Sequence, residues 1–147
     1  MPLLGQDLSG SLSRRVAILG PGLIGGSLAL ALSRVGQPWQ VSVWARREEA
    51  AQDAVALLPL CRVSCDLESV LADCDIAVLC MSPQAIQHCG EDLKNHLPTS
   101  ATITDAGSVK ANIVATLETT FGGRFIGAHP MAGSDQSGIQ AARADLF

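Results

Sequence analysis

The sequence predicts an α/β fold with a doubly wound, mainly parallel sheet of about six strands and helices on both faces. Short apolar runs alternate with segments of helical periodicity along most of the chain, a pattern typical of parallel strands joined by helical crossovers. The segment Gly20-Pro21-Gly22-Leu23-Ile24-Gly25 joins the first apolar run to the first helical one. Because a glycine turn in this setting is typical of dinucleotide-binding domains, the expected fold is of the Rossmann type.

Composition excludes several classes of protein. The chain has 147 residues, of which 48% are hydrophobic, so one domain with a buried core is expected. The net charge of -4 provides no basic surface for nucleic acid. Five cysteines without a C-x-x-C pair predict neither a disulfide framework nor a metal site, and most are expected to be small core residues in a reducing compartment. No segment reaches the roughly 20 apolar residues that span a bilayer, so we expect a cytoplasmic protein without a membrane partner.

The first half of the chain alternates strongly between the two kinds of element. Residues 1–13 are expected to form a flexible leader before a dinucleotide-binding domain at 14–147. Gly36 and Pro38 are expected to end the first helix, and Asp66 to cap the third. The expected strands lie at 15–19, 40–44 and 62–64, and the expected helices at 24–35, 48–58 and 67–72.

The second half repeats the unit. The apolar run 76–80 is expected to be a strand covered on both faces, followed by a helix with Ser82 as its cap and Pro83 in its first turn. Gly90 is expected to kink or split this helix. Further strands are expected at 101–104 and 124–128, and the two helices at 83–97 and 108–121, the second with Val109, Ile113, Leu117 and Phe121 on its apolar face.

The glycines of the turn have separate expected roles. Gly20 permits the tight turn, Gly22 lets the backbone approach a pyrophosphate, and Gly25 lets the helix pack on its strand. The alternative is a purely structural turn between strand and helix. Since ligands bind beyond the carboxyl ends of parallel strands, Leu23 and Ile24 after the first strand, and Ser82 and Pro83 after the fourth, are also expected to bind the cofactor.

The end of the second strand bears on the choice of cofactor. NAD-binding domains normally place Asp or Glu there, on the ribose hydroxyls, whereas this chain has Ala45 followed by Arg46 and Arg47. A small residue followed by guanidinium groups suits a 2′-phosphate, because arginine forms charge-assisted, bidentate bonds with phosphate. We therefore expect NADP, with NAD as second choice if both arginines are only solvated helix-start residues.

His129 is the candidate catalytic base. It follows the last apolar run at the ligand-facing end of the sheet, and a neutral imidazole can accept a proton from a substrate hydroxyl while hydride leaves the same carbon. The alternative is a histidine that anchors its loop. His88 and His96 lie in an expected surface helix and at its end, where solvated histidines are common.

Two segments resemble the signatures of the prephenate/arogenate (cyclohexadienyl) dehydrogenase family. They are Asp105-Ala106-Gly107-Ser108-Val109-Lys110 and the segment His129-Pro130-Met131-Ala132-Gly133-Ser134-Asp135-Gln136-Ser137-Gly138, followed by Ala141 and Leu146-Phe147. With the glycine turn they extend over nearly all of residues 14–147. Their order and spacing make the resemblance more specific than any single motif.

The resemblance implies an NAD(P)-dependent oxidoreductase that oxidatively decarboxylates prephenate or arogenate in tyrosine biosynthesis. His129 would accept the proton of the 4-hydroxyl group, and Ser108 would hydrogen-bond that hydroxyl and orient the histidine. Ser134 and Asp135 match residues that line the substrate pocket, although the family more often has Glu at the second position. The resemblance implies no role for Lys110.

Family members continue into a helical domain that forms a homodimer and supplies an arginine for the substrate carboxylate. Since this sequence stops at Phe147, we expect these residues to bind cofactor and to have little dehydrogenase activity by themselves. Another Rossmann reductase, of the β-hydroxyacid or imine type, and a non-catalytic nucleotide-binding module are the alternatives. The sequence does not distinguish prephenate from arogenate, nor does it reveal the oligomeric state or feedback by tyrosine.

Overall fold

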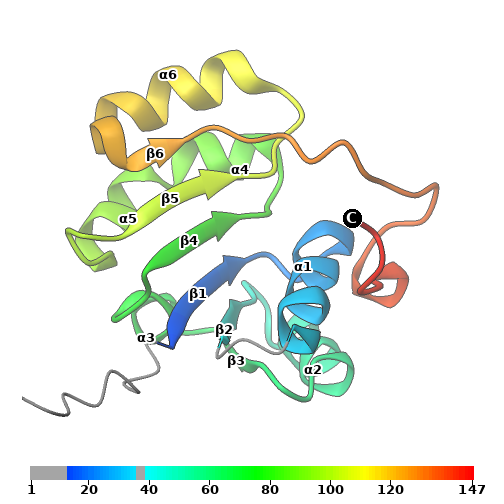
Figure 1. Cartoon of the computed structure of the whole chain (residues 1–147). Coiled ribbons are helices and arrows are strands. Elements are labelled where there is room, and N and C mark those ends of the chain that lie inside the picture. The colour runs from blue at the N-terminus through cyan, green and yellow to red at the C-terminus, as the bar shows by residue number, and fades with distance from the viewer. Residues whose placement is uncertain (1–12, 36–38) are drawn as a thin grey trace, which may run out of the picture.

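A computed structural model describes residues 13–35 and 39–147, and in it six strands form one parallel sheet in the order β3-β2-β1-β4-β5-β6 (Figure 1). Every pair of neighbouring strands is parallel. The predicted fold class is therefore confirmed. The expected leader, apart from Ser13, and the stop signal at Gly36 and Pro38 lie outside the described residues.

The elements follow the predicted alternation closely. The strands are β1 Arg14–Leu19, β2 Trp39–Trp44, β3 Arg62–Ser64, β4 Ile76–Leu79, β5 Thr102–Asp105 and β6 Phe125–Ile126. The helices are α1 Leu23–Arg34, α2 Glu48–Leu57, α3 Leu67–Leu71, α4 Pro83–His88, α5 Gly90–His96 and α6 Lys110–Phe121, with 3₁₀ turns η1 Gly122–Arg124 and η2 Ile139–Ala141.

The strand order places a switch point between β1 and β4. The chain runs outward from β1 to β3 on one side, then returns to β4 beside β1 and runs outward to β6 on the other. Leu19 is in register with Trp44 on one side and Leu79 on the other, so the strands end together. The loops that follow them meet at one edge, where ligands bind in sheets of this kind.

Two hydrophobic cores sit on opposite faces of the sheet. The first is formed by β-strand residues with α3, α4, α5 and α6, and includes Leu71, Ile86, Leu93, Ile113 and Leu117. The second lies under α1, α2 and η2, and includes Val43, Ala29, Ala54, Leu58 and Ile139. Burying apolar side chains on both faces is what stabilises a sheet whose faces are both covered by helices.

The apolar run at β4 is covered on both faces, as expected, but less tightly on one of them. Ala77 and Leu79 are buried, whereas Ile76 and Val78 are only half-buried. Ala77 and Leu79 belong to the first core, and Val78 packs against the second. The second face is covered less tightly because α1 and α2 lie nearer β1 and β2 (Figure 1).

Three local predictions are corrected by side-chain hydrogen bonds. Asp66 occupies the N-cap position of α3 but its side chain makes no capping bond, and its own N–H donates to Ser64 Oγ at 3.0 Å. Helix α6 begins at Lys110 rather than at Ser108, because Gly107 N–H donates to Asp105 Oδ2 at 2.9 Å and keeps this loop out of the helix. Val109 therefore lies before the helix and is 55% exposed instead of facing the core.

The sixth strand is shorter than the expected 124–128. Arg124 belongs to η1, where its guanidinium donates to Pro98 O at 2.9 Å. The ladder also ends after Ile126, because Ala128 N–H donates to the Asp105 carboxylate at 3.2 Å instead of to a strand carbonyl.

The predicted cap and the predicted break between α4 and α5 are both confirmed. Ser82 Oγ accepts a hydrogen bond from Ala85 N–H at 3.3 Å, and Pro83 begins the helix. The helix splits at Cys89, and a Cβ on Gly90 would lie 3.2 Å from Thr120 Oγ1. Glycine at this position therefore lets α5 approach α6 closely.

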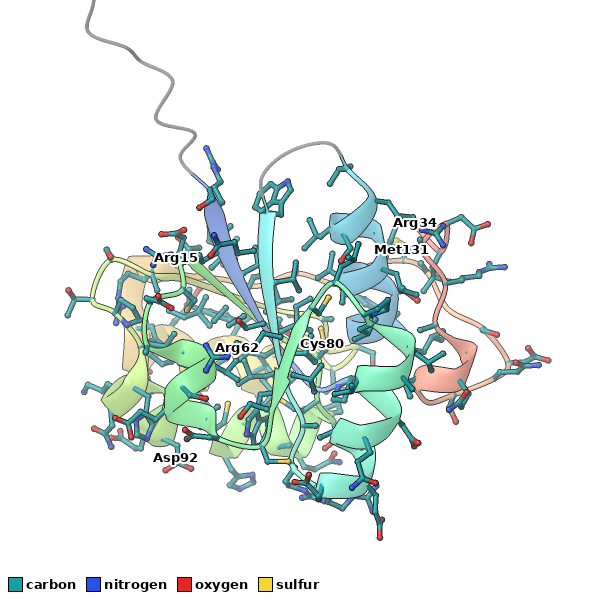
Figure 2. The ribbon with its side chains drawn as sticks, turned by 90° about the horizontal axis from the view of Figure 1, so that it is seen from below. Arg15, Arg34, Arg62, Cys80, Asp92 and Met131 are labelled. Carbon is teal, nitrogen blue, oxygen red and sulfur yellow. The ribbon has the colours of Figure 1, made fainter. Side chains whose placement is uncertain are left out.

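The five cysteines are all free, and four of them lie in or against the hydrophobic cores, as expected of small core residues. Cys74 is buried, Cys61, Cys80 and Cys89 are half-buried, and Cys65 is exposed. Figure 2 shows Cys80 near the middle of the molecule and Met131, which is 96% exposed, at its outside. Within the described residues, no helix has both the length and the apolar character that a bilayer crossing requires.

Candidate functional site

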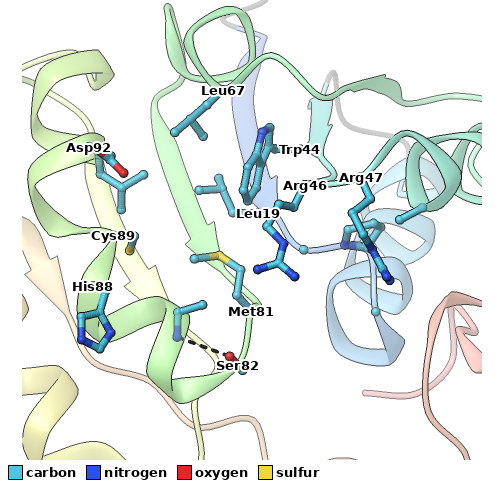
Figure 3. A pocket seen from close by; sticks show the side chains of 16 residues that line it. Leu19, Trp44, Arg46, Arg47, Leu67, Met81, Ser82, His88, Cys89 and Asp92 are labelled. Carbon is cyan, nitrogen blue, oxygen red and sulfur yellow. Dashed lines mark hydrogen bonds between the residues drawn. The ribbon is translucent and has the colours of Figure 1, made fainter.

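Two cavities open at the carboxyl edge of the sheet, one on each side of the glycine turn. The first, of about 570 Å³, is lined by Gly20 and Gly22, by the end of β2 and by α4 and α5 (Figure 3). The second, of about 360 Å³, is lined by Ile24 and Leu28 of α1, the ends of β4 and β5, and His129. An extended ligand that crosses the turn would contact both cavities.

The three motif glycines are required for different reasons. Gly20 has a φ of +107°, and a Cβ there would lie 2.8 Å from the carbonyl oxygen of Cys80. A Cβ on Gly25 would overlap the carbonyl oxygen of Gly20. By contrast, a Cβ on Gly22 would meet no atom within 4 Å, and Gly22 has a φ of -92°. The fold itself therefore requires Gly20 and Gly25, whereas the space beside Gly22 is open for a ligand.

The N-terminus of α1 suits an anion. No side chain caps it and its first turn contains no acidic residue, so its free N–H groups and the positive end of the helix dipole face the turn. Helix α4 also starts beside the first cavity, but the Ser82 hydroxyl already caps it. A phosphate group therefore fits α1 better than α4.

Arg46 and Arg47 both line the first cavity and are exposed. In Figure 3 the Arg46 side chain turns toward Met81 across the cavity, whereas Arg47 extends away from it. Ala45, which replaces the expected acidic residue, is buried. Two cations thus follow Ala45 at the end of β2, beside the glycine turn.

Most of the predicted cofactor-binding residues lie around these cavities. Gly20, Gly22, Arg46, Arg47 and Ser82 line the first cavity, and Ile24 lines the second. Among the described residues, Leu23, Gly25 and Pro83 line neither of the two. The side chains of Trp44, Met81 and His88 also line the first cavity, which the sequence did not predict because periodicity alone does not tell which loop residues turn inward.

The second cavity brings His129 to the end of α1. Apolar side chains dominate its lining, including Ile24, Leu28, Val78, Pro130 and Phe147. His129 is itself exposed, so its imidazole is accessible from solvent. An imidazole, an apolar wall and Ile24 of the glycine turn therefore surround the same space.

The other predicted catalytic and substrate residues lie outside this cavity. Ser108 is exposed on the loop between β5 and α6, and it is not among the described residues that line either cavity. Ser134 and Asp135 are exposed on the segment between β6 and η2, where their side-chain oxygens lie 3.2 Å apart. The structure thus places His129, but not Ser108, Ser134 or Asp135, at the cavity wall.

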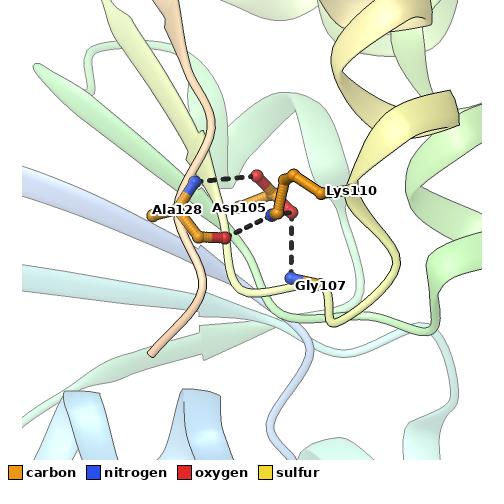
Figure 4. A network of polar contacts seen from close by, with 4 residues as sticks. All are labelled: Asp105, Gly107, Lys110 and Ala128. Carbon is orange, nitrogen blue, oxygen red and sulfur yellow. Dashed lines mark hydrogen bonds and ion pairs between the residues drawn. The ribbon is translucent and has the colours of Figure 1, made fainter. Parts of the chain in front are cut away.

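A buried carboxylate organises the loops behind His129 (Figure 4). Asp105, at the end of β5, accepts hydrogen bonds from Gly107 N–H at 2.9 Å and from Ala128 N–H at 3.2 Å, and it forms an ion pair with Lys110. Lys110 Nζ also donates to the carbonyl of Ala128. The sequence contained a signal for this network, because a single Asp at the end of an apolar strand must find partners when it is buried.

The family model for the nucleotide-binding domain of prephenate dehydrogenase matches residues 28–147 of the chain. Among relatives, the cyclohexadienyl dehydrogenase of Zymomonas mobilis is 30% identical over 135 residues, which are 91% of this chain and 46% of that protein.

Solved structures show the same similarity. The prephenate dehydrogenase of Aquifex aeolicus, in complex with hydroxyphenyl propionate and NAD+, superposes with a TM-score of 0.82 at 30% identity over 91% of this chain and 47% of that one. The Synechocystis arogenate dehydrogenase has a TM-score of 0.82 at 35% identity over 90% of this chain and 46% of that one. The chain therefore spans less than half the length of these proteins.

Proposed function

Because the chain belongs to the family of prephenate dehydrogenase nucleotide-binding domains, we propose that it binds the nicotinamide cofactor of an enzyme that oxidatively decarboxylates prephenate or arogenate. The observation that carries this proposal is the second cavity, where His129 and Ile24 line one space at the end of the glycine turn. Tyrosine biosynthesis is the process that such a reaction serves. The family match favours this function over a β-hydroxyacid or imine reductase.

His129 acts as the base in this proposal. A nicotinamide cofactor held by the residues of the glycine turn would supply the hydride acceptor for the ring carbon that bears the hydroxyl. His129 takes the hydroxyl proton as the hydride leaves, so a carbonyl forms. The carboxylate then departs as carbon dioxide, its bonding electrons make the ring aromatic, and the phenolate oxygen takes the proton back. The exposed imidazole lies at the wall of the largely apolar cavity, where a substrate hydroxyl could reach it.

Ser108 and the segment after His129 belong to the substrate side of the proposal. We infer that Ser108 hydrogen-bonds the substrate hydroxyl, because its loop leaves the carboxyl end of β5 beside the β6 segment that carries His129. Ser134 and Asp135 are assigned to substrate contacts on the resemblance of their motif. Their exposure leaves all three side chains accessible to a ligand above the cavity.

NADP is the proposed cofactor, with NAD as second choice. Arg46 and Arg47 line the cavity beside Gly20 and Gly22, and no carboxylate follows β2 before them. A 2′-phosphate at the end of β2 would meet the Arg46 guanidinium, with Arg47 beside it, and Ala45 in place of a repelling acid.

A cation for the substrate carboxylate is proposed to come from outside the described residues. None of the described residues that line the second cavity is Lys or Arg, and an unpaired carboxylate in an apolar cavity is costly. We propose that the whole protein is a homodimer whose remaining part supplies this group.

The function is tested by separating cofactor binding from turnover. We expect the 147 residues to bind NADP, as followed by the fluorescence of Trp44 in the first cavity, and the whole protein to turn over prephenate or arogenate with formation of NADPH. His129→Asn should abolish most turnover and leave binding intact, whereas Gly22→Ala should weaken binding because its Cβ enters the ligand space. His96→Asn, on α5, is the matched control.

Three results would contradict the proposal. Turnover of β-hydroxyacids without turnover of prephenate or arogenate would assign the chain to another class of reductase. Full turnover by His129→Asn would remove His129 from the chemistry, and binding without turnover of either substrate by the whole protein would indicate a nucleotide-binding module.

A further inference from the structure

The residue before His129 is held by two side chains rather than by the sheet. The backbone pairing of β5 with β6 ends at Thr104 and Ile126. Beyond that point Ala128 N–H donates to Asp105 Oδ1 at 3.2 Å, and the Ala128 carbonyl accepts from Lys110 Nζ. Asp105 and Lys110 thus replace the next rung of the ladder with a side-chain bridge (Figure 4).

The Asp105–Lys110 bridge is shielded from water and packed against its neighbours. The Asp105 side chain is 0% exposed and that of Lys110 is 30% exposed, so the ion pair is largely shielded from water. Gly107 N–H provides a third hydrogen bond to the carboxylate at 2.9 Å. A Cβ on Gly127 would lie 3.5 Å from Lys110 Cδ and 3.2 Å from Val114 Cγ2. The segment that leads to His129 therefore packs directly on the Lys110 stem.

The same geometry argues against Lys110 as a ligand for the substrate carboxylate. Its ammonium is already engaged by the Asp105 carboxylate and the Ala128 carbonyl. Withdrawing it would leave a buried carboxylate without its cation, which is unfavourable. Lys110 is also not among the described residues that line the second cavity, whereas Asp105, Ala128 and His129 are.

We propose that Lys110 and Asp105 are positioning residues that fix the backbone at Ala128 and thereby hold His129 at the wall of the second cavity. This inference rests on the proposed function, in which His129 is the base. It assigns a role to Lys110 that acts through His129 without contact with substrate or cofactor. A shift of about 1 Å in a catalytic group costs roughly 100-fold in rate, so a loosened Ala128 should be visible in kcat.

The first experiment measures how firmly the backbone at Ala128 and His129 is fixed. Amide hydrogen exchange in the 147-residue chain is compared between the unsubstituted protein, Lys110→Met and the control Lys94→Met, whose lysine is exposed on α5. We expect exchange at Ala128 and His129 to rise by about tenfold or more in Lys110→Met, with the core strands unchanged. Lys110→Arg, which keeps the charge and the donors, should restore part of the protection. Lys110→Gln serves the same comparison if Lys110→Met does not fold.

The second experiment asks whether the effect of Lys110 on turnover depends on His129. In the whole protein, Lys110→Met should lower kcat by roughly 10- to 100-fold and leave the affinity for NADP unchanged. In a His129→Asn background the same substitution should have no further effect, because residues that act as a unit are not additive. Lys94→Met should leave kcat unchanged.

The outcomes separate this inference from the proposed function. If the unsubstituted whole protein turns over neither prephenate nor arogenate, the proposed function fails. The exchange measurement still decides whether Lys110 and Asp105 fix the backbone at Ala128. Unchanged exchange at Ala128 in Lys110→Met overturns the inference, as does a loss of kcat that adds in full to that of His129→Asn.

Discussion

At the scale of single residues, the end of β2 is where the proposed function places the adenosine part of the dinucleotide. Ala45 is buried and offers no acid, while Arg46 and Arg47 line the first cavity. Of these two arginines, only Arg46 turns across this cavity in Figure 3. Arg46 is therefore the better candidate for a bidentate contact with a 2′-phosphate.

We predict that Arg46→Ala weakens NADP binding by roughly 10- to 100-fold, since a charge-assisted hydrogen bond contributes roughly 1.5–3 kcal/mol, and leaves NAD binding nearly unchanged. Dissociation constants for both cofactors, from titration calorimetry, measure this difference. Arg34→Ala, at the exposed end of α1, should alter neither constant. Tighter binding of NAD than of NADP by the unsubstituted chain would contradict the choice of cofactor.

At the scale of elements, α1 uses adjacent glycines for contacts on two sides. Gly25 faces β1 and the turn, where a Cβ would lie 3.1 Å from the Ile18 side chain. Gly26 faces η2, where a Cβ would lie 2.9 Å from Ala142 Cβ and 3.3 Å from Ile139 Cγ1. Buried Ser27 Oγ accepts a hydrogen bond from Arg143 N–H at 2.9 Å. The helix that bears the glycine turn thus also docks residues 139–147, and Phe147 reaches the second cavity.

We predict that Gly26→Ala loosens this docked segment, because overpacking of a tight contact costs about 1–3 kcal/mol. Limited trypsin digestion should then cleave after Arg143 several times faster than in the unsubstituted chain. Gly123→Ala is the matched control, since its Cβ meets no atom within 4 Å. Equal cleavage rates in all three proteins would show that η2 adapts to the added methyl group.

At the scale of the whole molecule, cysteine thiols in both cores make the free energy of unfolding depend on pH. Burial raises the pKa of Cys74 and of Cys89 to about 11, and that of Cys80 to about 12, from an ordinary value of 9.0. Cys74 and Cys89 belong to the first core, and Cys80 packs against the second. The folded protein therefore retains protons that the unfolded chain releases above about pH 9.

We predict that the free energy of unfolding is nearly constant between pH 7 and 8 and falls above pH 9, by at least about 1 kcal/mol at pH 10.5. The sign follows because the unfolded state binds fewer protons than the folded state in this range. The chain has no tyrosine to titrate there. Urea unfolding at pH 8 and 10.5 measures the effect.

Two variants identify the groups responsible for this pH dependence. Cys74→Ala should reduce the slope, whereas Cys65→Ala, which removes an exposed thiol, should change it little. An equal free energy of unfolding at both pH values would mean that the thiols titrate alike in the folded and unfolded chain.

The sequence predicted the architecture because local signals and the global fold agree. Apolar runs such as Val16 to Leu19 became buried strands, Ser82 capped α4, and Gly90 marked the split between α4 and α5. The signatures around Asp105 and His129 indicated the family, which the family match confirms. Gly20 and Gly25 were also assigned structural roles correctly, since a tight turn and close helix packing are local requirements.

Contacts between distant segments could not be predicted in this way. The start of α6 and the end of β6 both depend on the Asp105 carboxylate, which is bonded to Gly107 two residues later and to Ala128 on another strand. The sequence alone therefore determined the elements, their alternation and the residues that mark the family, because these follow from short-range periodicity and motif chemistry. Only the tertiary structure decided that Lys110 and Asp105 hold the segment before His129 and that Gly26 docks η2. The partners of a buried charge, and the atoms that pack against a glycine, come from distant parts of the chain that only the fold brings together.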